Sequence, residues 1–547
     1  PARGATRGGG GRAGGGGGPG PRVRAEGGAP PKNRLSDLKK SLCANGGGKA
    51  AGGWHTGPVR RAAVLLALAL GAAPAACREG VKPVRIAVHS APQSFDPHLQ
   101  NEILTSAVLA NLYDGLTEFD EESRVVPALA SEWRNPDEKT WVFRLRSGVV
   151  FHDGRPLTAA DVLFSLERAR HHSGSGLASY LVEIDSVRVT DPATIEIRTR
   201  RPFAAFLAKL TAIAIVPANA PPEIVDPVGT GSYRLARATE ETVELVPAAS
   251  HWRRGRVLPV TFVVDGDPRG RLQRLLSGDV DIAVGLAEND VARIGASECC
   301  RAIAQPGSTV EYLRLSPTAP PFRDRRVRQA IDLALDRSAY LAEAHGGIGQ
   351  PAGQLCVPGV FGFAPDLKAT VRDLPRARRL LEEAGFGGGL DLVLEHRPGR
   401  RGDVLARQLA EAGIRATPRV TPWTELHPRI RHGEVDFYFG GVVAQTAEAS
   451  DVLDGFVHTR DESRGYGSTN HSRYSNPAAD ALIESASAAL DLRRRRDLLQ
   501  RAMRVVMDDL YLLPVAGLYD VYGLRKEIAF EPRFDRRLPG RGIDRTR

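Results

Sequence analysis

The histidines and cysteines of this sequence do not fall into the spacings that catalysis or metal binding requires. The 547 residues contain 13 histidines and five cysteines. No Gly-x-Ser-x-Gly turn and no His-Glu-x-x-His pair occurs, so neither a hydrolase nucleophile nor a zinc-protease site is indicated. His152 and His471 are isolated and need no catalytic role. No Cys-x-x-Cys pair or spaced histidine cluster indicates a metal site. We therefore expect no enzyme, no cofactor and no bound metal.

A glycine turn, Pro227–Leu235, is the next feature that could hold a ligand. Gly229 and Gly231 would suit a phosphate cradle, but no Lys-Ser or Lys-Thr follows them and no helix begins there. The pattern instead predicts a turn that leads into a strand.

Cys299, Cys300 and Cys356 are the cysteines that follow Cys77. Three are too few for a disulfide scaffold. Two interpretations stay open, since an exported protein could pair one of the adjacent cysteines with Cys356, or all three could be small buried thiols.

The net charge of +10 lies entirely at the front of the chain. Residues 1–76 hold 12 Lys and Arg against Glu26 and Asp37, and the remainder holds 62 basic and 62 acidic residues. The folded part is therefore formally neutral, and the basic composition does not indicate a nucleic-acid partner.

The first 76 residues have the composition of a leader rather than of a folded domain. Residues 1–58 are rich in glycine, so we expect them to be disordered, or untranslated if Val59 is the initiator. Residues 59–76 combine two arginines, the apolar run 62–73 and small residues, which predicts a signal peptide. The apolar run is too short to span a membrane.

Small residues directly before Cys77 resemble the lipobox of bacterial lipoproteins. This resemblance implies lipid attachment at Cys77. The alternative is ordinary cleavage near Ala75, which would release a soluble periplasmic protein.

The chain after residue 83 alternates between strand and helix patterns, which predicts an α/β architecture. Thr158 and Asp161 form a capping-box pattern before an apolar helix, and Asp324 and Asp373 are plausible caps of two more. The other predicted elements are the strands 84–88 and 141–145, a helix that ends near Leu112, and a strand-rich stretch over 187–199.

Phrases spread over about 450 residues resemble family 5 of the bacterial solute-binding proteins. They include Ser94-Phe95-Asp96-Pro97-His98, Leu112-Tyr113-Asp114-Gly115-Leu116, Phe151-His152-Asp153-Gly154, Arg326-Val327-Arg328-Gln329-Ala330-Ile331, Tyr474-Ser475-Asn476-Pro477 and Leu513-Pro514-Val515. No single phrase is specific, but they occur in the order found in the family.

The resemblance implies a type II periplasmic-binding-protein fold, with two lobes and a small inserted domain that close about a hinge on the ligand. By analogy, lobe I comprises 83–113, 189–285 and 512–547. The inserted domain comprises 114–188, and lobe II comprises 286–511.

The resemblance also places ligand contacts in two loops, one after His98 and one after the strand that includes Tyr438. Tyr438, Tyr466 and Asn470 are added because aromatic and amide side chains commonly line such clefts. A solvated loop, or a core or surface position, is the alternative for each. The predicted ligand-binding residues are Asn101, Glu102, Thr105, Tyr438, Val442, Val443, Gln445, Thr446, Tyr466 and Asn470.

The second loop departs from the pattern of peptide-binding relatives. They carry a Trp after this strand and, three residues later, an Asp that pairs with the α-ammonium group of the peptide. Residues 440–446 contain neither. Glu448 or Asp451 is a possible substitute, while Gln445 and Thr446 could hydrogen-bond a neutral or hydroxylated ligand.

The resemblance therefore implies the extracytoplasmic substrate-binding component of an ABC importer, which delivers a peptide or peptide-like solute to membrane permease subunits. We expect a monomer in the periplasm or at the outer face of the cytoplasmic membrane. The alternatives are the same role for a nonpeptide solute such as a sugar, or a ligand-sensing regulator.

Overall fold

The computed structural model describes residues 81–99, 102–121, 123–255 and 257–546. The predicted disordered segment 1–58, the signal peptide 59–76, Cys77 and Asn101 lie outside the described residues. The chain divides into two units, residues 1–77 and 78–547, and every element below belongs to the second. Within the described ranges, no helix is long and apolar enough to cross a membrane.

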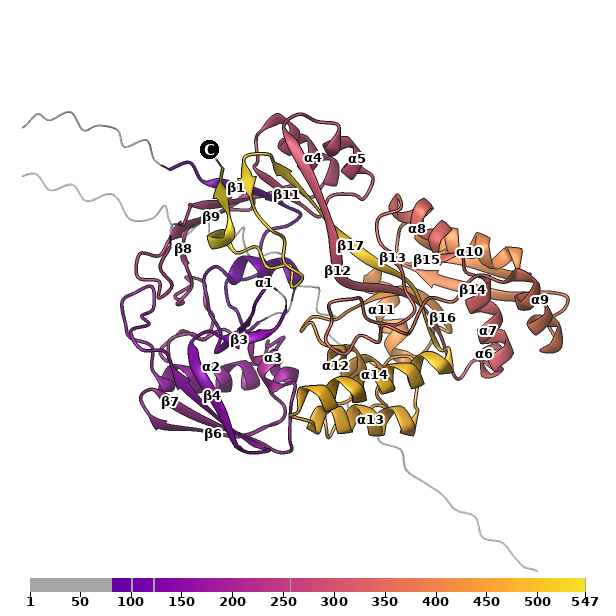
Figure 1. Cartoon of the computed structure of the whole chain (residues 1–547), viewed down its shortest axis with the longest axis horizontal. Helices are drawn as coiled ribbons and strands as arrows, with labels where there is room; N and C mark the ends of the chain where they lie inside the picture. The colour runs from indigo at the N-terminus through magenta and orange to yellow at the C-terminus, as the bar shows by residue number, and fades with distance from the viewer. Residues whose placement is uncertain (1–80, 100–101, 122, 256, 547) are drawn as a thin grey trace, which may run out of the picture. The chain divides into compact units, whose positions relative to one another are not determined.

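An 11-stranded mixed sheet forms the framework, and two long antiparallel strands run through its middle (Figure 1). These are β12 (Cys300–Leu315) and β17 (Leu512–Arg525). The order across the sheet is β15 (Ile414–Val420), β14 (Leu390–His396), β16 (Phe437–Val443), β12, β17, β11 (Ile282–Val284), β1 (Val84–Val88), β10 (Val260–Val264), β9 (Thr242–Pro247) and β8 (Tyr233–Ala238), and β13 (Gln350–Pro351) pairs with β17. The two long strands thus join chain segments that lie hundreds of residues apart.

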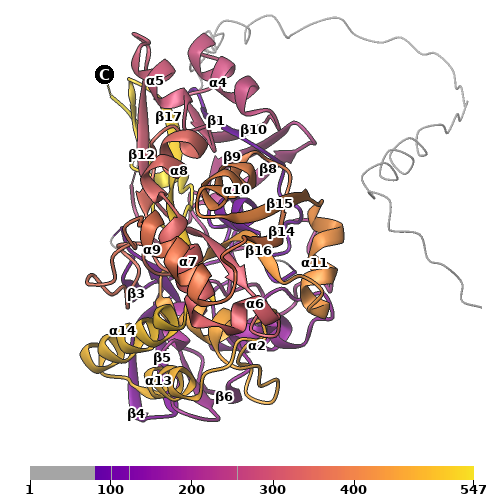
Figure 2. The same ribbon diagram turned by 90° about the vertical axis from the view of Figure 1, so that its right-hand side faces the viewer.

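Helices cover the sheet and bury apolar side chains against it. Two that run side by side, α13 (Pro477–Ala488) and α14 (Leu492–Asp509), are visible in Figures 1 and 2. The others are α1 (Ile103–Leu109), α4 (Pro268–Ser277), α5 (Asp290–Gly295), α6 (Pro320–Arg323), α7 (Arg325–Ala334), α8 (Arg337–His345), α9 (Leu374–Glu383), α10 (Arg401–Glu411), α11 (Trp423–His432) and α12 (Ala449–Val452), whereas α3 (Phe206–Leu210) packs against a smaller sheet. The predicted α/β class is confirmed.

A separate four-stranded antiparallel sheet packs against α2 (Ala159–His171). Its order is β4 (Ala130–Asp137), β5 (Thr140–Leu145), β7 (Thr194–Thr199) and β6 (Ile184–Asp191). The predicted end of the inserted domain at residue 188 falls inside β6. Since β6 and β7 pair along their length, this sheet continues to Thr199. Short two-stranded sheets join β2 (Thr117–Phe119) to β3 (Val125–Pro127) and β18 (Ile528–Ala529) to β19 (Asp544–Arg545).

The predicted helix caps are present. The backbone N–H of Thr158 donates to the Asp161 carboxylate (2.8 Å) at the start of α2. Asp324 accepts from the Arg326 N–H (2.9 Å) and Asp373 from the Arg376 N–H (3.0 Å), which begins α7 and α9. Each contact satisfies a backbone donor that the first turn of a helix leaves unpaired.

All three described cysteines are free thiols, so the disulfide alternative is not realised. Cys356 and Cys300 lie in different hydrophobic cores. Burial raises the pKa of the Cys356 thiol to about 12, which keeps it protonated and unreactive.

Candidate functional site

One cavity in the described part of the chain is lined by segments that are far apart in sequence. They come from α1 and the residues after it, from the 3₁₀ turn Ala178–Tyr180, from the loop after β16 and from residues 533–541 near the C-terminus. Its walls combine apolar side chains with many polar and charged groups, and a concave site of this kind can bind a small polar molecule.

The end of β16 and the loop after it contribute Val443, Gln445 and Thr446, three of the residues proposed from the sequence, to the lining of this cavity. The Asp451 carboxylate accepts hydrogen bonds from the backbone N–H groups of Gln445 (2.7 Å) and Thr446 (3.3 Å). Burial raises the pKa of Asp451. The hydroxyl of Tyr180 donates to Gln445 Oε1 (2.8 Å), so the loop is held on two sides.

The loop after His98 leads to the cavity through residues other than those predicted. Glu102 caps α1, because its carboxylate accepts from the N–H groups of Leu104 (2.9 Å) and Thr105 (2.7 Å). Thr105 is buried and its hydroxyl donates to the same carboxylate (2.8 Å). The residues of and beside α1 that line the cavity are Ile103, Ser106, Ala107, Leu109 and Ala110. The helical spacing of 103, 106, 107 and 110 is the signal that could have identified this face.

Tyr438 and Val442 pack into a hydrophobic core and are not among the residues that line the cavity. The Tyr438 ring meets Tyr312 edge-on with ring centres 6.3 Å apart, and the Arg314 guanidinium lies 5.6 Å from its centre. Burial raises the pKa of Tyr438.

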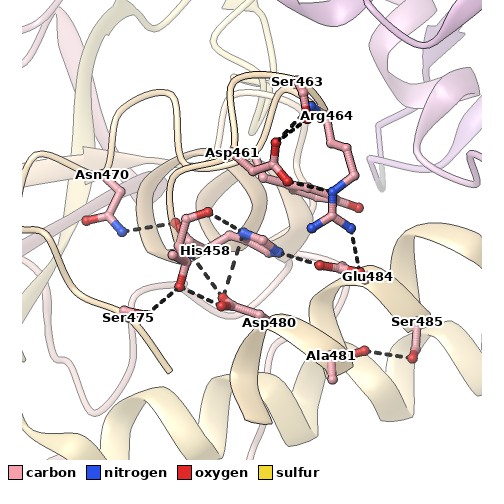
Figure 3. Close-up of polar contacts among 12 residues, drawn as sticks. His458, Asp461, Ser463, Arg464, Asn470, Ser475, Asp480, Ala481, Glu484 and Ser485 are labelled. Carbon is pink, nitrogen blue, oxygen red and sulfur yellow. Dashed lines mark hydrogen bonds and ion pairs between the residues drawn. The ribbon is translucent and has the colours of Figure 1, made fainter. Parts of the chain in front are cut away.

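Asn470 belongs to a polar loop in which His458 bonds Glu484 of α13 (Figure 3), and Tyr466 lies in the same loop. Asn470 Nδ2 donates to the carbonyls of Val457 (3.1 Å) and His458 (2.9 Å), and the His458 ring stacks on Tyr466 with centres 4.1 Å apart. The Tyr466 hydroxyl also accepts from Arg201 Nη1 (2.7 Å). Neither residue lines the cavity. Ligand contact stays a prediction for every residue proposed from the sequence, including Val443, Gln445 and Thr446, which line the cavity.

Glu448 already has a cationic partner. Its carboxylate binds both terminal nitrogens of Arg495, at 3.0 and 2.6 Å, and accepts from the Ser450 hydroxyl. Because Arg495 compensates its charge, Glu448 is a poor substitute for the missing ammonium-binding Asp.

The C-terminal stretch 533–541 is the part of the site that sequence reasoning missed. It brings four arginines to the cavity, together with Phe534 and Asp535. The density of arginines between Pro532 and Gly542 was visible in the sequence, but no periodicity assigned it to a site. Among the described residues, no group of three or more His, Cys, Asp or Glu is placed to hold a metal ion.

Comparison with known proteins gives the site its context. Residues 124–464 match the model of "Bacterial extracellular solute-binding proteins, family 5 Middle". A probable di/tripeptide-binding protein of Pseudomonas aeruginosa is 29% identical over 79% of this chain and 89% of its own. A glutathione-binding protein of Salmonella typhi is 28% identical over 83% of this chain and 92% of its own.

Among solved structures, the periplasmic binding protein DppA from Helicobacter pylori in complex with the peptide STSA superposes with a TM-score of 0.72. The two share 23% identity over 85% of this chain and 98% of that one, which shows the same fold. Since the family model covers more than half of the residues, the chain belongs to family 5 of the bacterial extracellular solute-binding proteins, which bind solutes and are not enzymes.

Proposed function

We propose that this chain is the substrate-binding component of an ABC importer, that it captures a small solute in the cavity, and that it delivers the solute to membrane permease subunits. The observation that carries the proposal is the convergence of α1, the Tyr180 turn, the loop after β16 and residues 533–541 on one cavity. These segments are far apart in sequence, and the fold brings their side chains together around one cavity, where a solute can contact all of them.

The solute is a peptide or a peptide-like compound in the first form of this proposal. Relatives whose names refer to di- and tripeptides and to glutathione support it. A nonpeptide solute is the second form. It is favoured by the loop after β16, where Glu448 is bound to Arg495 and Asp451 to backbone amides, so that neither carboxylate is free for an ammonium group.

Closure of two lobes about the long central strands would enclose the solute. The hydrogen bond from Tyr180 to Gln445 supports this, because it ties the four-stranded domain to the loop after β16. We also propose that the chain comprises two lobes and a small inserted domain. The pairing of β6 with β7 supports extending the inserted domain from residue 188 to Thr199.

The proposed location is outside the cytoplasmic membrane, with a lipid anchor at Cys77 and a monomeric chain. Small residues before Cys77 support the anchor. Labelling with a radioactive fatty acid, with Cys77→Ser as control, tests it.

Native mass spectrometry of the purified protein, followed by denaturation, tests the function. A released small peptide establishes the first form of the proposal, and a released nonpeptide solute establishes the second. A chain that carries no small molecule and gains none from a mixture of peptides, sugars and amino acids contradicts both.

Matched variants localise the solute. Gln445→Ala removes a side chain that lines the cavity, whereas Gln273→Ala removes an exposed glutamine on α4. We expect Gln445→Ala to bind the solute with an affinity about tenfold lower than that of Gln273→Ala. Equal retention by the two variants would place the solute elsewhere.

A further inference from the structure

Four arginines from one short segment lie along the cavity wall, and three of them are held by protein groups. Arg533 binds Asp535 through two hydrogen bonds of 2.9 and 2.7 Å. Arg536 binds Asp520 (2.6 Å), and Arg537 donates to the carbonyl of Thr211 (2.7 Å). The charge or donor groups of these three are therefore satisfied within the fold.

Arg541 differs from the other three. Its nearest carboxylate is that of Glu118, at 3.8 Å, which is beyond hydrogen-bond distance. Glu118 already accepts from both terminal nitrogens of Arg253. Among the described residues, no acceptor hydrogen-bonds the Arg541 guanidinium, and 37% of its side chain is exposed where it lines the cavity.

The other carboxylate near Arg541 is also engaged. Asp114 accepts from the Thr230 hydroxyl (2.9 Å) and from the Trp252 indole N–H (3.0 Å). Desolvation lowers the pKa of Arg541, and the nearby cation Arg253 lowers it further. Four arginines and the three carboxylates of Asp114, Glu118 and Asp535 line the cavity, so the arginines outnumber the carboxylates by one.

The backbone that presents Arg541 is clamped by one buried side chain. Asn111 Nδ2 donates to the Leu538 carbonyl (3.0 Å), and Asn111 Oδ1 accepts from the Gly540 N–H (2.8 Å). Asn111 is only 1% exposed. The clamp fixes the backbone from which the Arg541 side chain extends, so this part of the site needs no ordering when a ligand binds.

We infer that Arg541 is the anchor for an anionic group of the solute, most suitably a carboxylate, and that the importer therefore takes acidic small solutes. This inference rests on the proposed function, since it concerns the same cavity. A planar carboxylate can accept two parallel hydrogen bonds from a guanidinium and supplies the missing negative charge.

Isothermal titration of the full chain with matched probes tests the inference. The peptide probes are Ala-Glu, Ala-Gln and the C-terminal amide of each, so that the last, Ala-Gln-amide, has no carboxylate. Glucuronate and glucose form the nonpeptide pair. The variants are Arg541→Gln, Arg541→Lys and the control Arg254→Gln, which removes the same charge from an exposed residue that does not line the cavity.

We expect Arg541→Gln to lower the affinity for a carboxylate-bearing probe about tenfold to a hundredfold. The affinity for the matched probe without that carboxylate should change less than about threefold. The affinity of Arg541→Lys for a carboxylate-bearing probe should lie between those of Arg541→Gln and the wild type, because lysine keeps the charge but loses the two-pronged contact. Arg254→Gln should bind every probe as the wild type does.

The inference would be overturned if Arg541→Gln lost affinity equally for both members of a pair. It would also be overturned if the wild type bound probes with and without the carboxylate equally well. Either outcome leaves the proposed function intact, since a solute would still be bound. A wild-type chain that binds none of the six probes also overturns the inference for small acids. The mass-spectrometric result then decides the proposed function separately.

Discussion

The buried guanidinium of Arg168 on α2 forms a two-pronged ion pair with Asp96, whose side chain is fully buried. Arg168 Nη1 lies 2.8 Å from Asp96 Oδ1, and Nη2 donates to the Pro222 carbonyl at 2.6 Å. Asp96 also accepts from the N–H groups of His98 (3.1 Å) and Ile224 (3.2 Å). One carboxylate of the Ser94–His98 phrase thus joins three chain segments.

Asp96→Ala is therefore expected to lower the free energy of unfolding by about 3–5 kcal/mol, because it leaves a buried guanidinium uncompensated. Chemical denaturation measures the loss. Asp153→Ala is the control, since it removes one partner of the exposed pair with Arg155 and should cost less than about 1 kcal/mol. Similar losses for the two variants would contradict the role assigned to Asp96.

Protonation of His345 should make stability depend on pH. The ring is buried between the carboxylates of Glu288 (2.7 Å) and Glu311 (2.9 Å). Arg401 and the Tyr340 hydroxyl also reach Glu311. Burial would lower the pKa of His345, but the two carboxylates outweigh it and raise the pKa above its ordinary value of 6.5.

The folded chain therefore binds this proton more tightly than the unfolded chain. The stabilisation is fully present below about pH 6.5 and is lost as the pH rises through the raised pKa. Melting temperatures measured between pH 6 and 9 should fall less steeply for His345→Gln than for the wild type. His89→Gln, at an exposed histidine, should keep the wild-type slope, and an unchanged slope in the His345 variant would refute the assignment.

Gly229 should tolerate no side chain. Its backbone passes so close to the residues after α1 that a Cβ would lie 2.1 Å from the Leu112 carbonyl oxygen. We expect Gly229→Ala to cost about 1–3 kcal/mol of unfolding free energy. Gly295→Ala is the control, because a Cβ there meets no atom within 4 Å. A Gly229 variant as stable as the control would show that the turn can move away.

Loss of the Asp451 carboxylate should loosen the cavity loop. Asp451→Ala frees the N–H groups of Gln445 and Thr446, so their hydrogen exchange should accelerate about tenfold, equivalent to about 1.4 kcal/mol. Asp451→Asn keeps one acceptor oxygen and should show a smaller effect. Exchange mass spectrometry of the peptide over 443–447 measures both, and identical exchange in all three proteins would contradict this positioning role.

The sequence by itself determined the elements whose signals are local. The capping box of α2, the aspartates that begin α7 and α9 and the strand β1 all depend on residues within a few positions of one another. Backbone geometry allows few alternatives at such spacings, so residue types alone predict them. The family phrases could also be read from the sequence, and the resemblance that they carry indicated the loop after β16 as a candidate part of the site.

Only the tertiary structure decided which side chains reach the cavity. Tyr180 meets Gln445 across 265 positions, and Asn111 meets Gly540 across 429. Strand register and domain packing set these contacts, and a linear pattern does not encode them. For the same reason, Thr105 was proposed as a ligand contact only from the family resemblance and Tyr466 only from its chemical type. The arginines of 533–541 became visible as a site only when the chain brought its C-terminal segment beside α1.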